Sequence, residues 1–303
     1  MKSVRFAGLA LGLLAWLAVP RVAMPRDEPR VVALATTGNG QLFLLEGTSG
    51  LYAVDTKAQT LRRLPLRFSP YIAADLGVTP AGDQILVSLF LQGSNTLLTR
   101  LRRYTLDGKM TGEWSYAPSN SVLWSGAAVD PEGRIAYITN GRRPEVYRVD
   151  LTRSGSTSIR WTSVRGAEAV GAIAMDAQRK RLLVADPIGG VLFQVKLDGS
   201  SSSMVRGLEE PDALALDAAS DRLFVADAET GQVLVVNLAE AVPRARPFSG
   251  PIKGLEEPHA LALGRDGTVW VADHRSFTLF QLSSSGALLT TIRPKLVTAP
   301  ARR

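Results

Sequence analysis

The chain has 303 residues, of which 46% are hydrophobic and 21% charged, a composition typical of a globular protein rather than a disordered one. The net charge is +7, but no segment combines clustered basic and aromatic residues, so we expect no nucleic-acid binding. The absence of cysteine excludes disulfides, thiolate metal sites and cysteine nucleophiles.

The first 24 residues predict an export segment. Lys2 and Arg5 precede an apolar run at 6–19, which is shorter than the ~20 residues that a membrane span needs and suits the core of a signal peptide. We therefore expect residues 1–24 to be a signal peptide or an uncleaved N-terminal membrane anchor. The protein is then periplasmic or secreted, and touches a membrane only through this segment if the segment is retained.

Six related units follow the leader. Each contains an alternating apolar run, a polar turn, a second run, a turn with Gly or Ser, and a third and a weaker fourth run. The units become clearer along the chain, in the order 32–55, 76–108, 126–151, 172–199, 213–238 and 260–282. Short runs with strand alternation, repeated every ~44 residues, are typical of propeller blades.

These units predict a single all-β domain over residues 31–292. It is a six-bladed β-propeller of four-stranded antiparallel blades, followed by a basic tail at 293–303. Two segments are candidates for closing the ring, namely residues 21–30 as an extra outer strand and the sequence RPKLV at 293–297 as a latch. We expect a monomer.

An aspartate recurs at the end of the second run, in the tripeptide V-A-D. It stands at Asp186, Asp227 and Asp273. A ligand has no need to recur in successive blades, so we interpret these residues as structural carboxylates that bond neighbouring backbone groups.

The stretch GLEEPDALALD, followed by DRLFVADAETGQVLVVNL, resembles the NHL and YWTD type of six-bladed propeller. V-A-D stands where the YWTD family has W-T-D, and the resemblance is strongest over residues 166–290. The resemblance implies the propeller fold. It does not choose a function, because this group includes lactonases, lyases and binding modules.

The two histidines fall at informative places in the last unit. The first strand of a blade lines the central channel, and its start lies beside the end of the second strand, so His259 and His274 belong on one face of the ring. We assign His274 to the scaffold. The residues that match His259 in the other units are Asp212, Gly171, Ser125, Ala74 and Val32.

We predict a binding surface at this mouth of the channel. The two GLEEP loops bring glutamates toward the same face. The surface is formed by Ser125, Asp212, His259, Glu210 and Glu257. Carboxylates beside imidazoles are an environment for a divalent cation, calcium or zinc, so Asp212 and His259 are the candidate metal ligands and the candidate catalytic residues.

Two further resemblances bear on this site. PDALALD is similar to the P-D-G-L-A-V-D stretch of the SMP-30/gluconolactonase family, which implies that Asp212 binds a catalytic metal and acts as a base. The Asn and Glu ligands of that family are expected at Gly171 and at Val31 or Val32, so both are missing. EPHALALGRDGTVWVAD is similar to stretches of peptidyl-hydroxyglycine lyases and streptogramin lyases, which implies one His from each of several blades, but only His259 is present.

Three functions remain open. The first, which the incomplete ligand sets favour, is an exported scaffold that binds a protein, peptide or carbohydrate at its channel face without catalysis, with no tightly bound metal and no cofactor-binding residues. The second is a metal-dependent hydrolase or lyase, such as an SMP-30-like lactonase, with an incomplete site at the channel mouth. The third is a structural component of an envelope complex.

Overall fold

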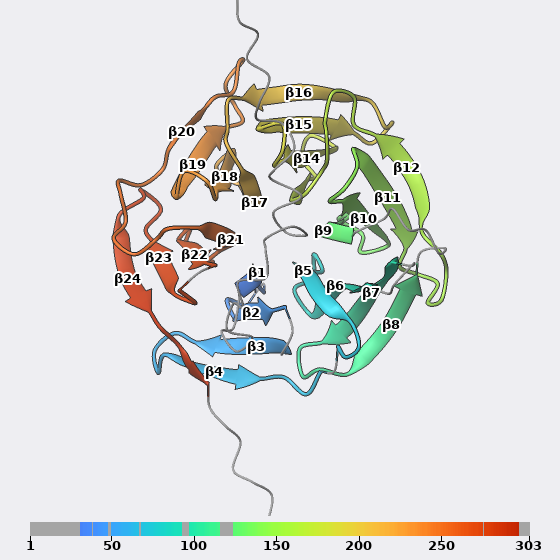
Figure 1. The fold of residues 1–303 in the computed structure, drawn as a ribbon, viewed down its shortest axis with the longest axis horizontal. Helices are drawn as coiled ribbons and strands as arrows, with labels where there is room; N and C mark the ends of the chain where they lie inside the picture. The colour runs from blue at the N-terminus through green and yellow to red at the C-terminus, as the bar shows by residue number, and fades with distance from the viewer. Residues whose placement is uncertain are drawn as a thin grey trace, which may run out of the picture.

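The computed structural model describes residues 31–37, 39–47, 50–66, 68–92, 97–115, 124–274 and 276–296. They form six blades of antiparallel strands in a ring around a central channel (Figure 1). This confirms the predicted all-β, six-bladed propeller. The expected export segment, 1–24, and the candidate closing strand, 21–30, lie outside the described residues.

Each blade uses four strands in chain order, with the first strand at the channel and the fourth at the outer edge (Figure 1). Blades 1 and 2 contain β1 (Val31–Thr36), β2 (Leu42–Glu46), β3 (Gly50–Asp55), β4 (Thr60–Arg63), β5 (Ile72–Val78), β6 (Gln84–Gln92), β7 (Leu97–Thr105) and β8 (Met110–Ser115). Blades 3 and 4 contain β9 (Trp124–Val129), β10 (Ile135–Asn140), β11 (Glu145–Asp150), β12 (Ile159–Ser163), β13 (Ile173–Asp176), β14 (Arg181–Asp186), β15 (Val191–Lys196) and β16 (Ser201–Arg206). Blades 5 and 6 contain β17 (Pro211–Asp217), β18 (Arg222–Asp227), β19 (Gln232–Asn237), β20 (Ala245–Pro247), β21 (Pro258–Leu263), β22 (Val269–Asp273), β23 (Leu279–Leu282) and β24 (Leu288–Ile292).

The core lies between the blades. Six hydrophobic clusters occupy the described residues, one at each interface between neighbouring blades. Small side chains such as Ala33 and Ala260 lie on the inner strands, whereas large ones such as Phe43 and Phe224 lie on the second strands. This gradient of size fits blades that converge on the channel and spread toward the rim. The cluster between blades 6 and 1 contains buried residues of both blades, as the other five clusters do for their own pairs of blades, so hydrophobic packing closes the ring.

A short C-terminal strand, β25 (Lys295–Leu296), also joins the ring. It pairs in parallel with β4 and makes a fifth strand in the first blade. The amide of Lys295 donates to the carbonyl of Gln59 at 3.1 Å. Of the two candidates for closing the ring, the RPKLV segment therefore supplies a latch, and the predicted tail at 293–303 begins with a strand because the outer edge of β4 accepts it.

The inner strands share one irregularity, a β-bulge near the start of the strand. Register shifts mark it in β1, β5, β9, β17 and β21. In blade 4 the same region precedes β13, where Gly171 donates to Ala185 and Ala185 to Ala172. The bulge re-aims one side chain in each blade at the same level of the channel.

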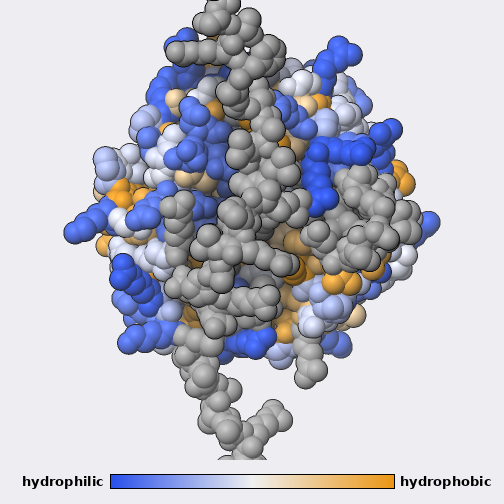
Figure 2. Space-filling view, in the orientation of Figure 1, coloured by the Kyte–Doolittle hydropathy of each residue, from blue (hydrophilic) through white to orange (hydrophobic). Residues whose placement is uncertain are grey.

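The described residues contain no helix with the length and apolar character that a membrane span requires. On the face shown in Figure 2, hydrophilic side chains predominate around the rim of the ring, and the coloured hydrophobic ones form separate patches.

Candidate functional site at the channel mouth

The bulges of blades 5 and 6 bring Asp212 and His259 together. The strand partners of Pro211 and Ala213 are adjacent residues of β18, so Asp212 is the extra residue of its bulge, and His259 holds the same place in β21. The distance from Nδ1 of His259 to Oδ2 of Asp212 is 2.9 Å. Both side chains keep about a fifth of their surface exposed, 21% for His259 and 19% for Asp212. The two candidate residues thus form a hydrogen-bonded pair that remains accessible to a ligand.

The pair has a defined polarity. A carboxylate only accepts hydrogen bonds, so Nδ1 of His259 donates and Nε2 has no hydrogen-bond partner among the described residues. Burial lowers the pKa of His259, but the hydrogen bond and charge of Asp212, with the charges of Glu257 and Glu210, raise the pKa above its usual value. When the imidazole titrates, Nε2 is therefore the nitrogen that gains or loses the proton.

His274 packs against this pair. Its ring lies with its centroid 4.6 Å from that of His259, at an interplanar angle of 48°. Nδ1 of His274 donates to the carbonyl of Val31 at 3.1 Å, and the amide of His274 donates to the carbonyl of Glu257. His274 is 8% exposed and links blade 6 to blade 1, so it supports the position of His259 from the closing interface.

The GLEEP loops bring carboxylates to the pair. Glu210 and Glu257 are half-buried, whereas Glu209 and Glu256 are exposed. Burial raises the pKa of Glu210 to about 7, and the charges of Asp212, Glu229 and Glu257 act in the same direction, while His259 opposes them. At neutral pH Glu210 is thus poised between its protonated and ionised forms.

Asp75 is a site residue that the sequence analysis missed. It lies on β5, one position after the bulge, where the other five units have Ala or Gly. Its Oδ2 accepts the amide of Ala127 from blade 3 at 2.8 Å. Burial raises the pKa of Asp75 to about 6, although the amides of Leu76 and Ala127 and the charge of His259 lower it. The departure from small residues in the repeat was the available signal.

The remaining predicted positions contribute less. The hydroxyl of Ser125 lies 3.3 Å from both the carbonyl of Val170 and the hydroxyl of Thr139, so it bonds within the interface of blades 3 and 4. The equivalent residues of the other blades are Val32, Ala74 and Gly171, none of which carries a polar side chain. The chemistry of the mouth is therefore concentrated in blades 5 and 6, with Asp75 from blade 2.

The V-A-D carboxylates have a different surrounding. Each is buried and accepts amides from the connection that leads into the first strand of its own blade and from the turn that follows it. Asp227 accepts hydrogen bonds from the backbone amides of Glu209 and Glu210. Asp186 accepts them from the backbone amides of Glu168 and Gly189. Asp273 accepts hydrogen bonds from the backbone amides of Glu256, Glu257 and Ser276. These bonds hold the GLEEP loops in place and so position Glu210 and Glu257.

The described residues at the mouth do not form a complete metal site. Nδ1 of His259 donates to Asp212, so within this imidazole only Nε2 keeps a lone pair that a metal ion could use. Among the described residues, no three His, Asp or Glu side chains come together as a metal site requires. At the place where the SMP-30 resemblance implies an Asn ligand, Gly171 offers no side chain.

Replacing Asp212 with Asn is expected to lower the pKa of His259, because burial then acts without the charge of Asp212 to oppose it. The chain has two histidines, so a pH titration followed by NMR resolves one signal for each imidazole. His274 serves as the internal control, since its Nδ1 bonds a carbonyl instead. An unchanged pKa of His259 would contradict the pairing.

Comparisons with known proteins agree with this architecture. Residues 162–301 match the model of the SMP-30/Gluconolactonase/LRE-like region, which confirms the resemblance read from the C-terminal units. No curated protein matches the chain.

Solved structures with the same fold have low sequence identity. A chain of a nidogen/laminin complex matches with 16% identity and a TM-score of 0.62, over 88% of this chain and 94% of that one. An auxiliary nutrient binding protein from Bacteroides thetaiotaomicron VPI-5482 matches with 11% identity and a TM-score of 0.61, over 81% and 67%. A catalytically inactive virginiamycin B lyase from Staphylococcus aureus, solved with quinupristin, matches with 12% identity and a TM-score of 0.58, over 83% and 94%.

Fold, motifs and comparisons together define a class. The protein is a six-bladed β-propeller whose C-terminal half is similar to the SMP-30/gluconolactonase group. The likeness to the solved structures extends to the fold alone.

Proposed function

We propose that this protein is an exported binding module that takes its ligand at the channel mouth through Asp212 and His259. One observation carries the proposal. The bulge is shared by the blades, yet its residue is Val32, Ala74, Ser125 or Gly171 in four of them. The backbone there requires neither a carboxylate nor an imidazole.

Half-burying such groups removes hydration and costs stability unless something compensates. The hydrogen bond between them offsets part of the cost but leaves Nε2 of His259 and the second carboxylate oxygen for a ligand. Asp212, Glu210 and Glu257 offer acceptors, and His259 offers a donor when charged. This set suits the hydroxyl groups of a carbohydrate or the main-chain and amine groups of a peptide or protein.

Other observations support binding over catalysis by a resident metal. The ligand sets that the lactonase and lyase resemblances imply are incomplete. Solved propellers of this fold include a chain from a nidogen/laminin complex and a nutrient binding protein, so binding is one use of the fold. Export rests on the leader at residues 1–24.

The test is a screen of carbohydrate and peptide arrays with the purified, labelled protein, followed by affinity measurements on the hits. In the double variant Asp212→Ala/His259→Ala, we expect the affinity for a true ligand to fall by about tenfold or more, or 1.4 kcal/mol. The matched control is Glu132→Ala/Arg134→Ala, in the turn before β10 at the opposite end of the blade, which is expected to bind as the parent does.

Ligands that bind the double variant equally well would place recognition elsewhere, and no binding on either array would contradict the proposal. One calcium or zinc ion per chain, lost on Asp212→Ala, would instead support the metal-dependent hydrolase or lyase. Stable co-purification with envelope proteins that survives the double variant would favour the structural role.

A further inference from the structure

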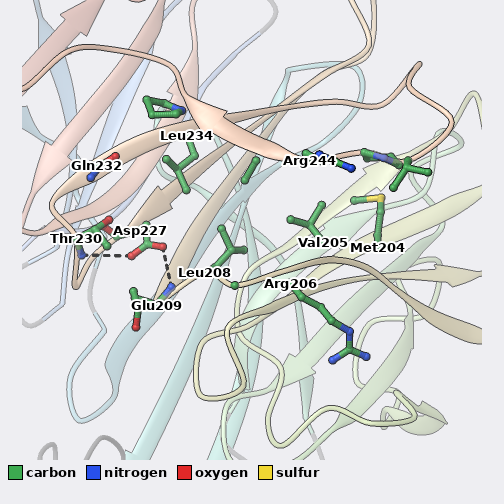
Figure 3. A pocket seen from close by; sticks show the side chains of 15 residues that line it. Met204, Val205, Arg206, Leu208, Glu209, Asp227, Thr230, Gln232, Leu234 and Arg244 are labelled. Carbon is green, nitrogen blue, oxygen red and sulfur yellow. Dashed lines mark hydrogen bonds between the residues drawn. The ribbon is translucent and has the colours of Figure 1, made fainter.

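A groove lies on the side of the ring, away from the channel, between the outer strands of blades 4 and 5. It has a volume of about 680 Å³ and is lined by residues of β16, β19 and the segment that leads into β20 (Figure 3). None of the channel-mouth residues Asp212, His259 or Glu257 lines it. It is therefore a separate surface, and an inference about it does not depend on the proposed function.

The groove exists because the outer strand of blade 5 is short. β20 has three residues and pairs with β19 only from Leu234 to Val236. In blade 4 the outer strand β16 has six residues and covers β15 from Val191 to Val195. Pro243 lies before the short strand and Pro247 is its last residue, and proline cannot donate to a β-ladder. A hollow remains where a full fourth strand would lie.

The floor of the groove is apolar and its rim exposes apolar surface to water. Val205 and Leu208 are buried in the floor, and Leu234 is half-buried beside them. At the rim, Val242 is 67% exposed, more than any other large hydrophobic residue of the described part of the chain. Water contact with apolar surface is unfavourable by roughly 25 cal/mol per Å², so a partner that covers Val242 gains affinity from its burial.

The charges of the groove are separated along its length. Arg206 and Arg244 lie at one end, with Met204 and Val205, and Glu209 lies at the other end near Asp227 (Figure 3). Both arginines are exposed, and neither forms an ion pair with an acidic residue of the described chain, in contrast to Arg246, which pairs with Glu240. Asp227 is occupied by backbone amides. The apolar end of the groove is therefore lined by cationic side chains, and the charge of Arg244 also acts on Glu240.

We propose that this groove binds an extended peptide segment of a partner protein in which acidic residues alternate with aliphatic ones. Guanidinium groups bind carboxylates in a bidentate manner, and an alternating strand presents its carboxylates to the arginines and its aliphatic side chains to the apolar floor. The exposed rim favours an extended chain over a small molecule, because small-molecule sites enclose most of their ligand.

The test uses the full chain and a short fluorescein-labelled peptide of alternating glutamate and valine. Fluorescence anisotropy at low ionic strength measures its affinity, with an alternating lysine and valine peptide as the charge control. The variant is Arg206→Glu/Arg244→Glu. Both side chains are exposed and unpaired, so the variant is expected to keep the melting temperature of the parent. Its affinity for the acidic peptide is expected to fall by about tenfold or more.

The repeat supplies a matched control for this variant. Arg165 stands one blade earlier at the place of Arg206, since each precedes a glycine with positive φ. The outer strand of the blade that follows Arg165 is β16, which has six residues, whereas β20, in the blade that follows Arg206, has three. The variant Arg165→Glu/Arg134→Glu carries the same change in charge and is expected to bind as the parent does. The proposal is overturned if the parent shows no saturable binding of the acidic peptide, if the lysine peptide binds as tightly, or if the control loses the same affinity.

Discussion

Replacing Asp273 with Ala is expected to lower the free energy of unfolding by about 3 kcal/mol or more, a large part of the total stability of a domain. The carboxylate is 0% exposed, and its Oδ2 accepts the amides of Glu256 and Glu257, both at 2.8 Å. Its Oδ1 accepts the amide and the hydroxyl of Ser276 at 2.7 Å. Alanine leaves these donors without partners inside the protein.

Urea unfolding of both proteins measures this loss. Asp198→Ala is the matched control, because Asp198 also accepts an amide and a hydroxyl, from Ser200, but on an exposed turn where water replaces them. Its unfolding midpoint is expected to stay close to that of the parent. If the urea midpoint of Asp273→Ala equals that of Asp198→Ala, the V-A-D aspartate does not hold the GLEEP loop. The positions of Glu256 and Glu257 then need another explanation.

At alkaline pH, Asp75→Asn is expected to have a larger free energy of unfolding than the parent, by about 2 to 3 kcal/mol. This size follows from a pKa of Asp75 of about 6 in the folded protein and 3.8 in the unfolded chain. The raised pKa means that the folded state holds its proton more tightly. The stability from the protonated carboxyl is full below about pH 4 and is lost as the pH rises through about 6. Asparagine cannot ionise and its Oδ1 can still accept the amide of Ala127.

Unfolding free energies of the two proteins, measured from about pH 4 to about pH 8, check this prediction. The difference between them should grow with pH through this window. Asp198→Asn is again the control, and its difference from the parent should not show this growth, because the hydrogen bonds from Ser200 lower the pKa of Asp198 and keep it ionised across this window. A difference that is flat with pH would mean that Asp75 keeps its charge without cost, and that its environment in the channel is more polar than its burial implies.

The repeat made the fold predictable. Alternating runs and turn residues are local signals, and they recur often enough that the faint first units could be aligned with the clear last ones. The alignment also predicted which residues share one level of the channel, and the structure brings Asp212 and His259 into contact as the neighbouring units imply. A shared register converts sequence spacing into proximity across blades.

Other features depend on contacts that spacing does not encode. Asp75 is held by an amide of the next blade, the hydroxyl of Ser125 bonds into a blade interface, and His274 of the last blade bonds the carbonyl of Val31 in the first. The latch depends on an open edge at β4, and the groove depends on the shortness of β20. Each of these is a non-local consequence of how the ring closes and packs.

The shared bulge has a consequence for how new chemistry can arise on this scaffold. The side chain at the bulge is valine, alanine, aspartate or histidine in different blades, while the strand pairing around it keeps the same shift, so a ligand-binding group can be installed by one substitution without refolding a blade. At Gly171 an added Cβ would meet only Pro187, at 3.5 Å, an ordinary contact distance. The mouth of the ring therefore offers positions, such as Val32, Ala74 and Gly171, at which the side chain can be exchanged with little effect on the blade.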